Sequence, residues 1–242
     1  MISDTIKKLE FILSDERNLQ KILNERSFTV SRNYRDKSQW YETTYPITLK
    51  RYEDTRNSAL IESWAERISW VFSWVAAIPA GGFDTGAMEQ MSRLEAHYFD
   101  VRLENIDIES FMGDIYSSNH GETMFVSPLG ADPTPIKIFV ILADKIIHVN
   151  ERWNNTLSTT TKLLHFTFPG LFPIYDEKIH NILFIGKTQN YRHYHAYLIA
   201  LHQFLRTSPL VSMLKKYAED KNVTLVRLIE MVLFSRAYRI QF

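Results

Sequence analysis

Residues 162–176, with the sequence KLLHFTFPGLFPIYD, limit what this 242-residue chain can fold into more than any other segment. Pro169 has no amide proton and Gly170 tolerates left-handed backbone geometry, so together they predict the end of a helix. Pro173 stiffens the apolar turn that follows. Asp176 then stands where a carboxylate accepts hydrogen bonds from the free amides of a new helix. The segment therefore predicts a helix end, a rigid apolar turn and a capped helix start.

The spacing of apolar residues predicts an all-α protein, a compact assembly of many helices. Apolar positions recur every three or four residues in most of the chain, which is the period of a helix with one buried face. The β-branched residues of the segment 136–153 also allow a strand, but their spacing fits a helix better. Helices are expected over 3–25 (one or two), 57–78, 88–98, 136–153, a stretch ending near His165, 176–184, 191–205 and 225–235.

The chain divides by composition into two parts that we expect to form one compact unit. Residues 116–135 are rich in serine, glycine and proline and predict a linker or long loop. We therefore expect an N-terminal helical part over residues 1–135. A basic C-terminal helical part over residues 136–242 carries the Pro-Gly turn and Asp176.

Composition excludes several classes of protein. The chain is 45% hydrophobic and 13% aromatic, as in a packed globular protein and unlike a disordered one. It has no cysteine, which excludes a disulfide framework, a thiolate zinc site and a thiol nucleophile. The first eight residues lack the apolar core of a signal peptide, and the longest apolar stretch, residues 69–79, is too short to cross a bilayer. We expect a cytoplasmic protein without membrane contact and without a cofactor.

Charge is unevenly distributed along the chain. Residues 1–150 carry 16 Lys+Arg and 22 Asp+Glu, whereas residues 151–242 carry 12 and 6. A basic C-terminal face fits a nucleic-acid partner; attraction between the two parts of one fold is the alternative. Residues 26–57 interleave basic and aromatic side chains, as single-strand-binding surfaces do. The interpretation that we favour there is a loop whose rings fold back onto the core. These side chains are Arg32, Tyr34, Arg35, Lys37, Trp40, Tyr41 and Tyr45.

The segment from Lys162 through Asp176 and on to Ile179 resembles one found in uncharacterised bacterial helical proteins. Those proteins are distantly similar to the helix-hairpin-helix DNA glycosylases, in which a hairpin is followed by an apolar-Pro-Val-Asp stretch. Residues 172–176, FPIYD, are similar to that stretch with one additional residue before the aspartate. Residues 225–234 also resemble the final helix of the bacterial proteins. The resemblance covers residues 158–184 and 225–235.

The resemblance implies roles for residues around the turn. Asp176 would be the catalytic carboxylate. Tyr175 would wedge or stack against bases, and Lys178 or His180 would contact a phosphate. The glycosylase hairpin binds a phosphate through a glycine-rich turn, whereas residues 156–161 contain no glycine. There the hydroxyls of Thr160 and Thr161, the helix start and Lys162 would take that role.

Two features of the sequence depart from this family or extend beyond it. The bifunctional glycosylases carry a lysine nucleophile well upstream of the aspartate. Lys162 lies only fourteen residues before Asp176, so we do not expect lyase chemistry from it. Tyr191, Arg192 and His193 begin a later helix and are expected to line a polar groove beside Asp176, and His195 follows them as a further expected contact to nucleic acid. Their spacing matches no metal motif, and we expect no metal site.

The leading hypothesis is a DNA-binding protein with base-excision (N-glycosylase) activity on damaged or modified bases, in genome maintenance or phage defence. A non-enzymatic helical interaction protein is the first alternative, in which Asp176 only caps a helix. A helical ribonuclease-like toxin or abortive-infection component is the second, based on Arg192, His193 and His195. Arg227 and Glu230, three residues apart, are expected to form an ordinary ion pair within one helix.

Overall fold

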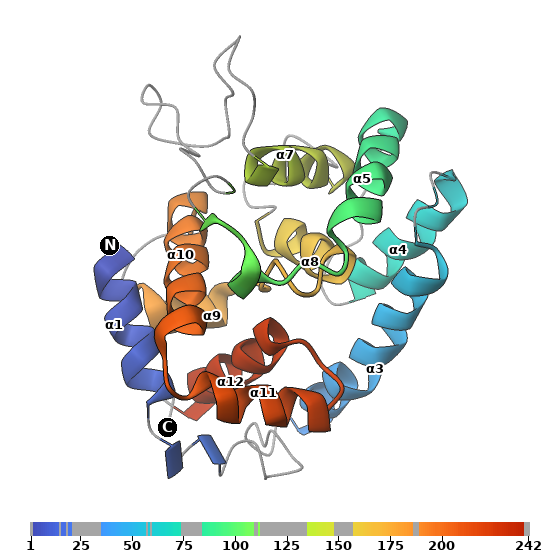
Figure 1. Ribbon diagram of the computed structural model, residues 1–242. Helices are drawn as coiled ribbons and strands as arrows, with labels where there is room; N and C mark the ends of the chain where they lie inside the picture. The colour runs from blue at the N-terminus through green and yellow to red at the C-terminus, as the bar shows by residue number, and fades with distance from the viewer. Residues whose placement is uncertain are drawn as a thin grey trace.

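The fold is all-helical, as the apolar spacing predicted. The computed structural model describes residues 2–14, 16–17, 19–20, 35–56, 58, 60–73, 84–108, 111, 135–147, 157–185 and 189–239. These residues form ten α-helices and one 3-10 helix and contain no strand (Figure 1). The elements are α1 (Ile2–Leu13), α3 (Arg35–Asp54), α4 (Ile61–Ser73), α5 (Thr85–Tyr98), η1 (Leu103–Asn105), α7 (Pro135–Ile147), α8 (Leu157–Thr167), α9 (Glu177–Leu183), α10 (Tyr191–Thr207), α11 (Val211–Asp220) and α12 (Leu225–Arg239).

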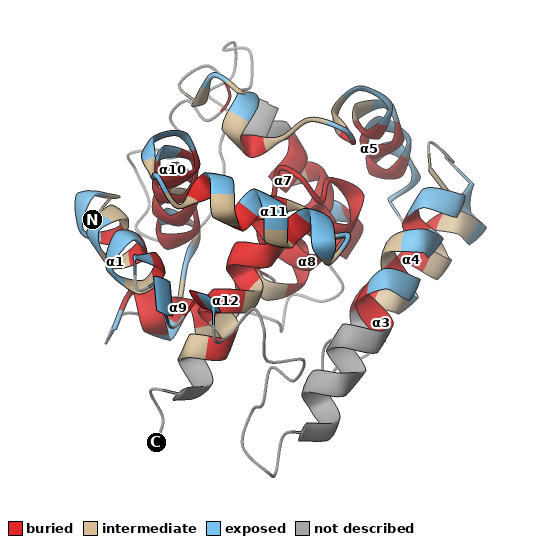
Figure 2. Ribbon diagram, turned by 60° about the horizontal axis from the view of Figure 1, so that its bottom comes forward, coloured by how far each residue is buried: buried red, intermediate tan, exposed pale blue. Residues whose placement is uncertain are grey.

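Helix α8 is the centre of the molecule. Every residue of α8 except Ser158 is buried, and a helix that is buried on all sides must have neighbours all around it. α3, α4 and α7 pack directly against α8, and Figure 1 shows α7 above it, α3 and α4 on one side and α12 below. Colouring by burial shows α8 as an almost continuous red ribbon (Figure 2). The Pro-Gly turn that leaves α8 consequently starts inside the core.

The remaining helices pack on one another around this group, each through one buried face. α1 packs against α10 and α9, and Lys8 of α1 donates a hydrogen bond of 2.7 Å to the Leu183 carbonyl. That carbonyl belongs to the last turn of α9, where helical carbonyls lack intrahelical donors and a cation is favourable. α9 also packs against α12. This short helix is therefore held at its end by α1 and along its side by α12.

One hydrophobic core crosses the proposed division at residue 135. The buried apolar cluster runs from Leu9 in α1 to Leu233 in α12. Aromatic rings join the two parts: Tyr98 of α5 lies edge-to-face against Phe139 of α7 with ring centroids 5.2 Å apart, and Phe139 lies edge-to-face against Phe168 at 4.8 Å. Edge-to-face pairs at these distances are favourable beyond simple burial. The described residues on both sides of position 135 share one core.

Helix α3 corrects the expectation of a loop over residues 26–57. Tyr45, Thr48 and Tyr52 are buried on one face of α3, and Pro46 lies on its exposed side. Packing against α4 and α8 overrides the helix-breaking tendency of Pro46 and the polar composition. The ring of Tyr45 is on the core, as the favoured interpretation held. Arg32 and Tyr34 lie outside the described residues, as do the side chains of Arg35, Lys37, Trp40 and Tyr41.

Helix α11 was not expected from the sequence. It is short and ends at a turn in which Asn222 has a φ of 50°, a left-handed conformation that asparagine tolerates better than most residues. The Val223 amide donates to the Ala218 carbonyl at 3.0 Å and closes the turn. The predicted helix over 136–153 is described as far as Ile147, as helix α7 (Pro135–Ile147). Residues 148–153, and residues 116–134 of the predicted linker, lie outside the described residues. In the part of the chain that is described, no helix is long and apolar enough to cross a membrane.

Candidate functional site

The turn between α8 and α9 is a buried loop, and it confirms the predicted helix end and capped helix start. α8 ends at Thr167, just before Phe168 and Pro169, and Asp176 is the N-cap of α9. Residues 168–175 are all buried. Connecting segments normally run over the surface, because their backbone polar groups need partners. This loop must therefore obtain its hydrogen-bond partners from the helices around it.

Side chains from three helices (α8, α10 and α12), side chains from two loop segments and one backbone amide of η1 supply those partners. His165 Nδ1 lies 2.7 Å from the Phe172 carbonyl and donates to it. Glu230 accepts from the Ile174 amide, and Thr161 accepts from the Tyr175 amide at 3.0 Å. Further bonds join Thr224 Oγ1 to the Pro169 carbonyl (2.7 Å), the Leu103 amide to the Gly170 carbonyl (2.8 Å), Tyr194 Oη to the Pro173 carbonyl (3.1 Å) and Gln189 Nε2 to the Tyr175 carbonyl (3.2 Å). The loop is fixed almost residue by residue.

Glycine is required at position 170 for a reason other than the left-handed backbone geometry that the sequence suggested. Its backbone is not in the left-handed region. A Cβ placed on Gly170 would instead lie 2.6 Å from the Val101 carbonyl and 2.5 Å from Arg102 Nη1. The close approach of the segment before η1, which also bonds to the Gly170 carbonyl, leaves no room for a side chain. Glycine here allows two backbones to touch.

Asp176 uses one carboxylate oxygen as a helix cap. Its Oδ1 accepts hydrogen bonds from the amides of Lys178 and Ile179, each at 3.0 Å. The residue is partly exposed, and among the described residues both cap bonds fall on Oδ1. Asp176 is therefore a cap, as predicted, with its second oxygen left over from that role.

Lys162 lies close to Asp176 in the folded chain. Its side chain is buried, with Nζ donating to Ser158 Oγ at 3.1 Å. Burial lowers the pKa of the Lys162 amine, while the nearby Asp176 carboxylate opposes that shift. Fourteen residues of chain thus bring a buried amine and a half-buried carboxylate together. The loop turns back on α8, where Thr161 accepts from the Tyr175 amide, and this return brings Asp176 towards Lys162.

Thr160 and Thr161, which we expected to hold a phosphate, are both fully buried. The Thr161 hydroxyl accepts from the Tyr175 amide and lies 3.1 Å from the Ser158 carbonyl. Thr160 Oγ1 is buried without a hydrogen-bond partner in the described structure. The prediction of surface hydroxyls is wrong, because the start of α8 lies inside the fold.

Tyr175 and the histidines near it also lie inside rather than on a surface. Tyr175 is fully buried, and its hydroxyl lies 2.7 Å from His180 Nδ1. The ring of His180 lies 5.2 Å from that of His193, which in turn lies 4.5 Å from the ring of Phe184. These contacts join α9 to the start of α10. Tyr175 is not placed to wedge between bases, and His180 and His193 are not placed to touch a phosphate.

Three of the expected binding residues are accessible. Arg192 is exposed, and Lys178 and His195 are partly exposed. Asn190 caps α10 by accepting from the His193 amide at 3.1 Å, which turns His193 inward while its neighbour Arg192 faces out. No group of three or more metal-binding side chains occurs among the residues that the structure describes.

His165, Arg227 and Glu230 form a largely buried polar network, of which the sequence predicted only the Arg227–Glu230 pair. Arg227 Nη1 donates to Glu230 Oε2 at 3.1 Å, and its guanidinium lies 4.3 Å from the centre of the Tyr45 ring. The Tyr45 hydroxyl lies 2.9 Å from His165 Nε2. Burial lowers the pKa of His165 to about 3, with Arg227 adding to the shift. His165 is therefore neutral, with its proton on Nδ1 and Nε2 accepting from Tyr45. The Arg227–Glu230 pair, expected to be ordinary, is part of the core.

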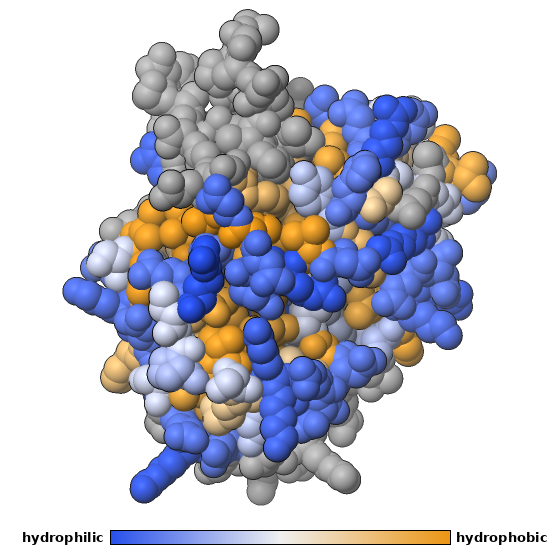
Figure 3. Space-filling view, in the orientation of Figure 1, coloured by the Kyte–Doolittle hydropathy of each residue, from blue (hydrophilic) through white to orange (hydrophobic). Residues whose placement is uncertain are grey.

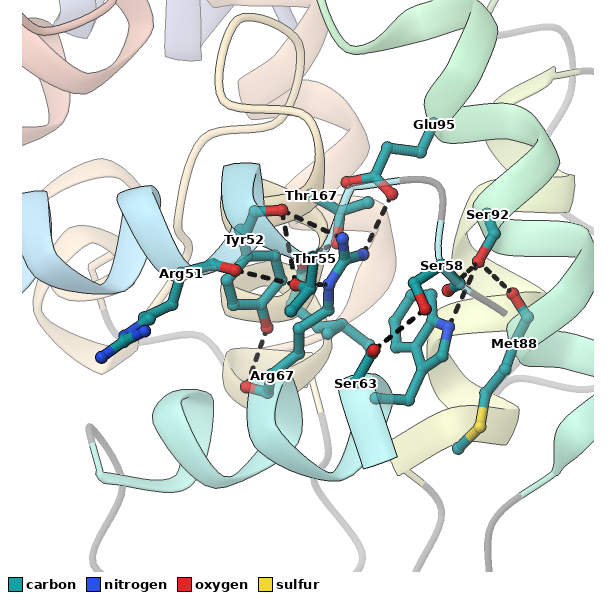
Figure 4. Close-up of polar contacts among 12 residues, drawn as sticks. Arg51, Tyr52, Thr55, Ser58, Ser63, Arg67, Met88, Ser92, Glu95 and Thr167 are labelled. Atoms are coloured by element: carbon teal, nitrogen blue, oxygen red, sulfur yellow. Dashed lines mark hydrogen bonds and ion pairs between the residues drawn. The ribbon is translucent and has the colours of Figure 1, made fainter. Parts of the chain in front are cut away.

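A second buried network lies away from the loop and holds α3, α4 and α5 together (Figure 4). Arg67 and Glu95 are both fully buried and form an ion pair of 3.0 Å. Arg67 also donates to Thr55 Oγ1 at 2.8 Å and to the Tyr52 carbonyl at 3.0 Å. A buried charge with this many partners stabilises the arrangement only as long as every partner is present. Its groups face each other and serve the packing of these helices.

Comparison of the chain with protein-family models, curated proteins and solved structures finds no match in any of the three.

Proposed function

We propose that this protein binds DNA and removes a base, with the Asp176 carboxylate at the reacting sugar. The observation that carries the proposal is the Asp176 carboxylate at the end of a clamped loop, where Oδ1 alone accepts both cap bonds of α9 and Oδ2 takes no part in the cap. The resemblance of residues 162–179 to the glycosylase segment supports the same function. The +6 balance of residues 151–242 also favours an anionic partner.

The chemistry requires a fixed negative charge. Cleaving the bond between a base and deoxyribose passes through a sugar with oxocarbenium character, as in glycoside hydrolysis. A carboxylate held in place stabilises that positive charge or activates water, and it is most effective when it does not have to reorganise. The free oxygen of Asp176 is suited to this role, because the cap bonds hold the other oxygen. The base itself must first leave the helical stack.

The accessible surface is compatible with a charged partner. The face in Figure 3 is mostly hydrophilic, with apolar residues showing between polar ones. Lys178 and Arg192 lie at the starts of α9 and α10. Both residues follow the loop in the sequence, as Asp176 does. Phosphate contacts from these two residues would position the DNA.

The test compares wild type with Asp176→Asn on end-labelled duplexes that carry a panel of damaged and modified bases, with alkali to reveal abasic sites. Asparagine caps a helix as well as aspartate does, so D176N removes the charge and keeps the cap. We expect abasic sites with wild type and a loss of at least a hundredfold in D176N. Asp84→Asn is the matched control, because Asp84 caps α5 in the same way, accepting from the Ala87 amide at 2.8 Å. D84N should cleave as wild type does.

The non-enzymatic alternative rests on the cap itself, since both cap bonds of Asp176 are well formed. It predicts no abasic site on any duplex and no difference between D176N and D84N in any assay. The ribonuclease alternative is based on Arg192, His193 and His195. Arg192 is exposed and His195 is partly exposed, whereas His193 is buried against Phe184, so the accessible part of that set is the Arg192/His195 pair.

A further inference from the structure

Glu230 is a buried carboxylate that binds the loop directly. It lies on α12 with only 1% of its surface exposed. Its Oε1 accepts from the Ile174 amide, and its Oε2 accepts from Arg227. Ile174 precedes Asp176 by two residues, so α12 reaches the backbone next to the proposed catalytic carboxylate.

Two helices hold consecutive amides of this stretch. Glu230 of α12 accepts from Ile174, and Thr161 of α8 accepts from Tyr175. Bonds to two successive amides fix the orientations of two successive peptide planes, because each amide points to its own acceptor. The next residue is Asp176. Its position relative to Lys162, one residue after Thr161, is thereby set by both helices together.

Burying a carboxylate to accept a hydrogen bond from one amide has a high free-energy cost. A buried charge is destabilising unless it is fully paired, and a protein in which apolar residues replace a buried ion pair is often no less stable. A neutral acceptor would have sufficed for the Ile174 amide. A carboxylate accepts more strongly than a neutral oxygen and forms shorter, better-defined bonds. Precision at Ile174 is the benefit that the ionised form of Glu230 offers, and that benefit is complete only above the raised pKa of this carboxyl group.

We propose that Glu230 is a positioning residue for Asp176, acting through the Ile174 amide, with Arg227 as its counterion. This inference rests on the proposed function. Glu230 does not touch the reacting sugar. Its effect reaches the reaction only through the place at which Asp176 is held.

The surroundings of Glu230 make its charge state a sensitive readout. Burial raises the pKa of Glu230 to about 8, and the Arg227 guanidinium and the Ile174 amide oppose that rise. The ionised form is the stronger acceptor, so positioning should improve as the pH rises through this value. The ionisable groups that face Glu230 are Arg227 on α12, His165 on α8 with Nδ1 3.5 Å from Oε1, Tyr45 on α3, Tyr194 and Tyr197 on α10, and Asp176.

The experiment compares Glu230→Gln with a matched loss of a buried, ion-paired carboxylate elsewhere. Glu95→Gln serves as that control, because Glu95 pairs with Arg67 and does not contact the loop. Single-turnover excision is measured with enzyme in excess, from pH 6 to 9. We expect E230Q to lose between about tenfold and a hundredfold in rate, the effect of a small displacement of a reacting group, and to lose the inflection near pH 8. E95Q should keep both the wild-type rate and the inflection.

A second readout does not depend on excision. Amide hydrogen exchange at Ile174 and Tyr175, measured by NMR, should be faster in E230Q than in wild type and unchanged in E95Q. A wild-type rate and pH profile in E230Q would overturn the inference, as would unchanged exchange at Ile174. If wild type excises no base from any duplex, the proposed function fails, and exchange alone then decides whether Glu230 fixes the loop. Should E230Q fail to fold, Glu230→Asp replaces it, because aspartate keeps the charge and shortens the reach. Wild-type rate and exchange in E230D would overturn the inference equally.

Discussion

The amide of Tyr175 donates a hydrogen bond of 3.0 Å to the hydroxyl of Thr161. This bond joins the residue before Asp176 to the residue before Lys162, and both partners are fully buried. The carboxylate and the amine of the candidate site are therefore held by neighbours that are bonded to each other. Loss of this bond should therefore change the positions of both the Asp176 carboxylate and the Lys162 amine.

Thr161→Val should lower the free energy of unfolding by about 1–3 kcal/mol. Valine has the shape of threonine without its hydroxyl, so the Tyr175 amide would be buried without that acceptor. Thr160→Val is the matched control. Thr160 is equally buried but its hydroxyl has no hydrogen-bond partner in the described structure, so losing that hydroxyl should be neutral or stabilising. Urea unfolding of both variants measures the difference, and equal losses would contradict the role given to Thr161.

Gly170→Ala should be destabilised by about 1–3 kcal/mol, because the new methyl group would overlap the Val101 carbonyl. That carbonyl is backbone and is held next to the η1 segment, which itself bonds to Gly170. Gly86→Ala, in the first turn of α5, is the contrasting change. The nearest atom to a Cβ there is Asp84 Oδ1 at 3.5 Å, so alanine should stabilise this helix by about 0.5–1 kcal/mol. Thermal unfolding of the two variants should move in opposite directions.

His165 should make the folded state less stable as the pH falls. Its pKa is about 3 in the folded chain, against an ordinary value of 6.5. Between these two values the unfolded chain binds a proton at this position and the folded chain does not. Stability from His165 is therefore fully present above pH 6.5 and is lost towards pH 3, by about 1.4 kcal/mol per pH unit.

The comparison for this prediction is His165→Gln, which has no group that titrates in this range. Glu230 contributes in the opposite sense, since its raised pKa gives stability that is lost as the pH rises to about 8, but it is present in both proteins. The difference in slope between them isolates His165. Identical slopes from pH 4 to 6 would show that this imidazole is not held neutral.

Local chemistry explains the parts of the fold that the sequence predicted well. Pro169 and Asp176 act within one turn of their own backbone, so the end of α8 and the start of α9 could be predicted without knowledge of the rest. The apolar seam of α10 was equally clear. Helix α3 was missed because its polar, proline-containing sequence is helical only when Tyr45 and Tyr52 are buried against α8.

The candidate site shows the same division. Asp176 was predicted to cap the helix after the turn, and it is the N-cap of α9. Six of the nine expected nucleic-acid contacts are buried, because nothing local in the sequence shows that α8 lies at the centre of the fold; these are Thr160, Thr161, Lys162, Tyr175, His180 and His193. Glu230 was predicted only as the partner of Arg227, and its contact with the loop was missed for a related reason. It is 56 residues from Ile174 along the chain, and no spacing rule connects them.

The sequence by itself determined that the chain is helical, where α8 ends and that Asp176 caps the next helix, because these depend on backbone chemistry within a few residues. Only the tertiary structure decided which side chains meet the loop, that Gly170 must admit a neighbouring backbone, and that Lys162 lies beside Asp176. Those relationships depend on which helices surround α8. Packing of distant segments around one buried helix, and the need to satisfy each polar group enclosed by it, settled them.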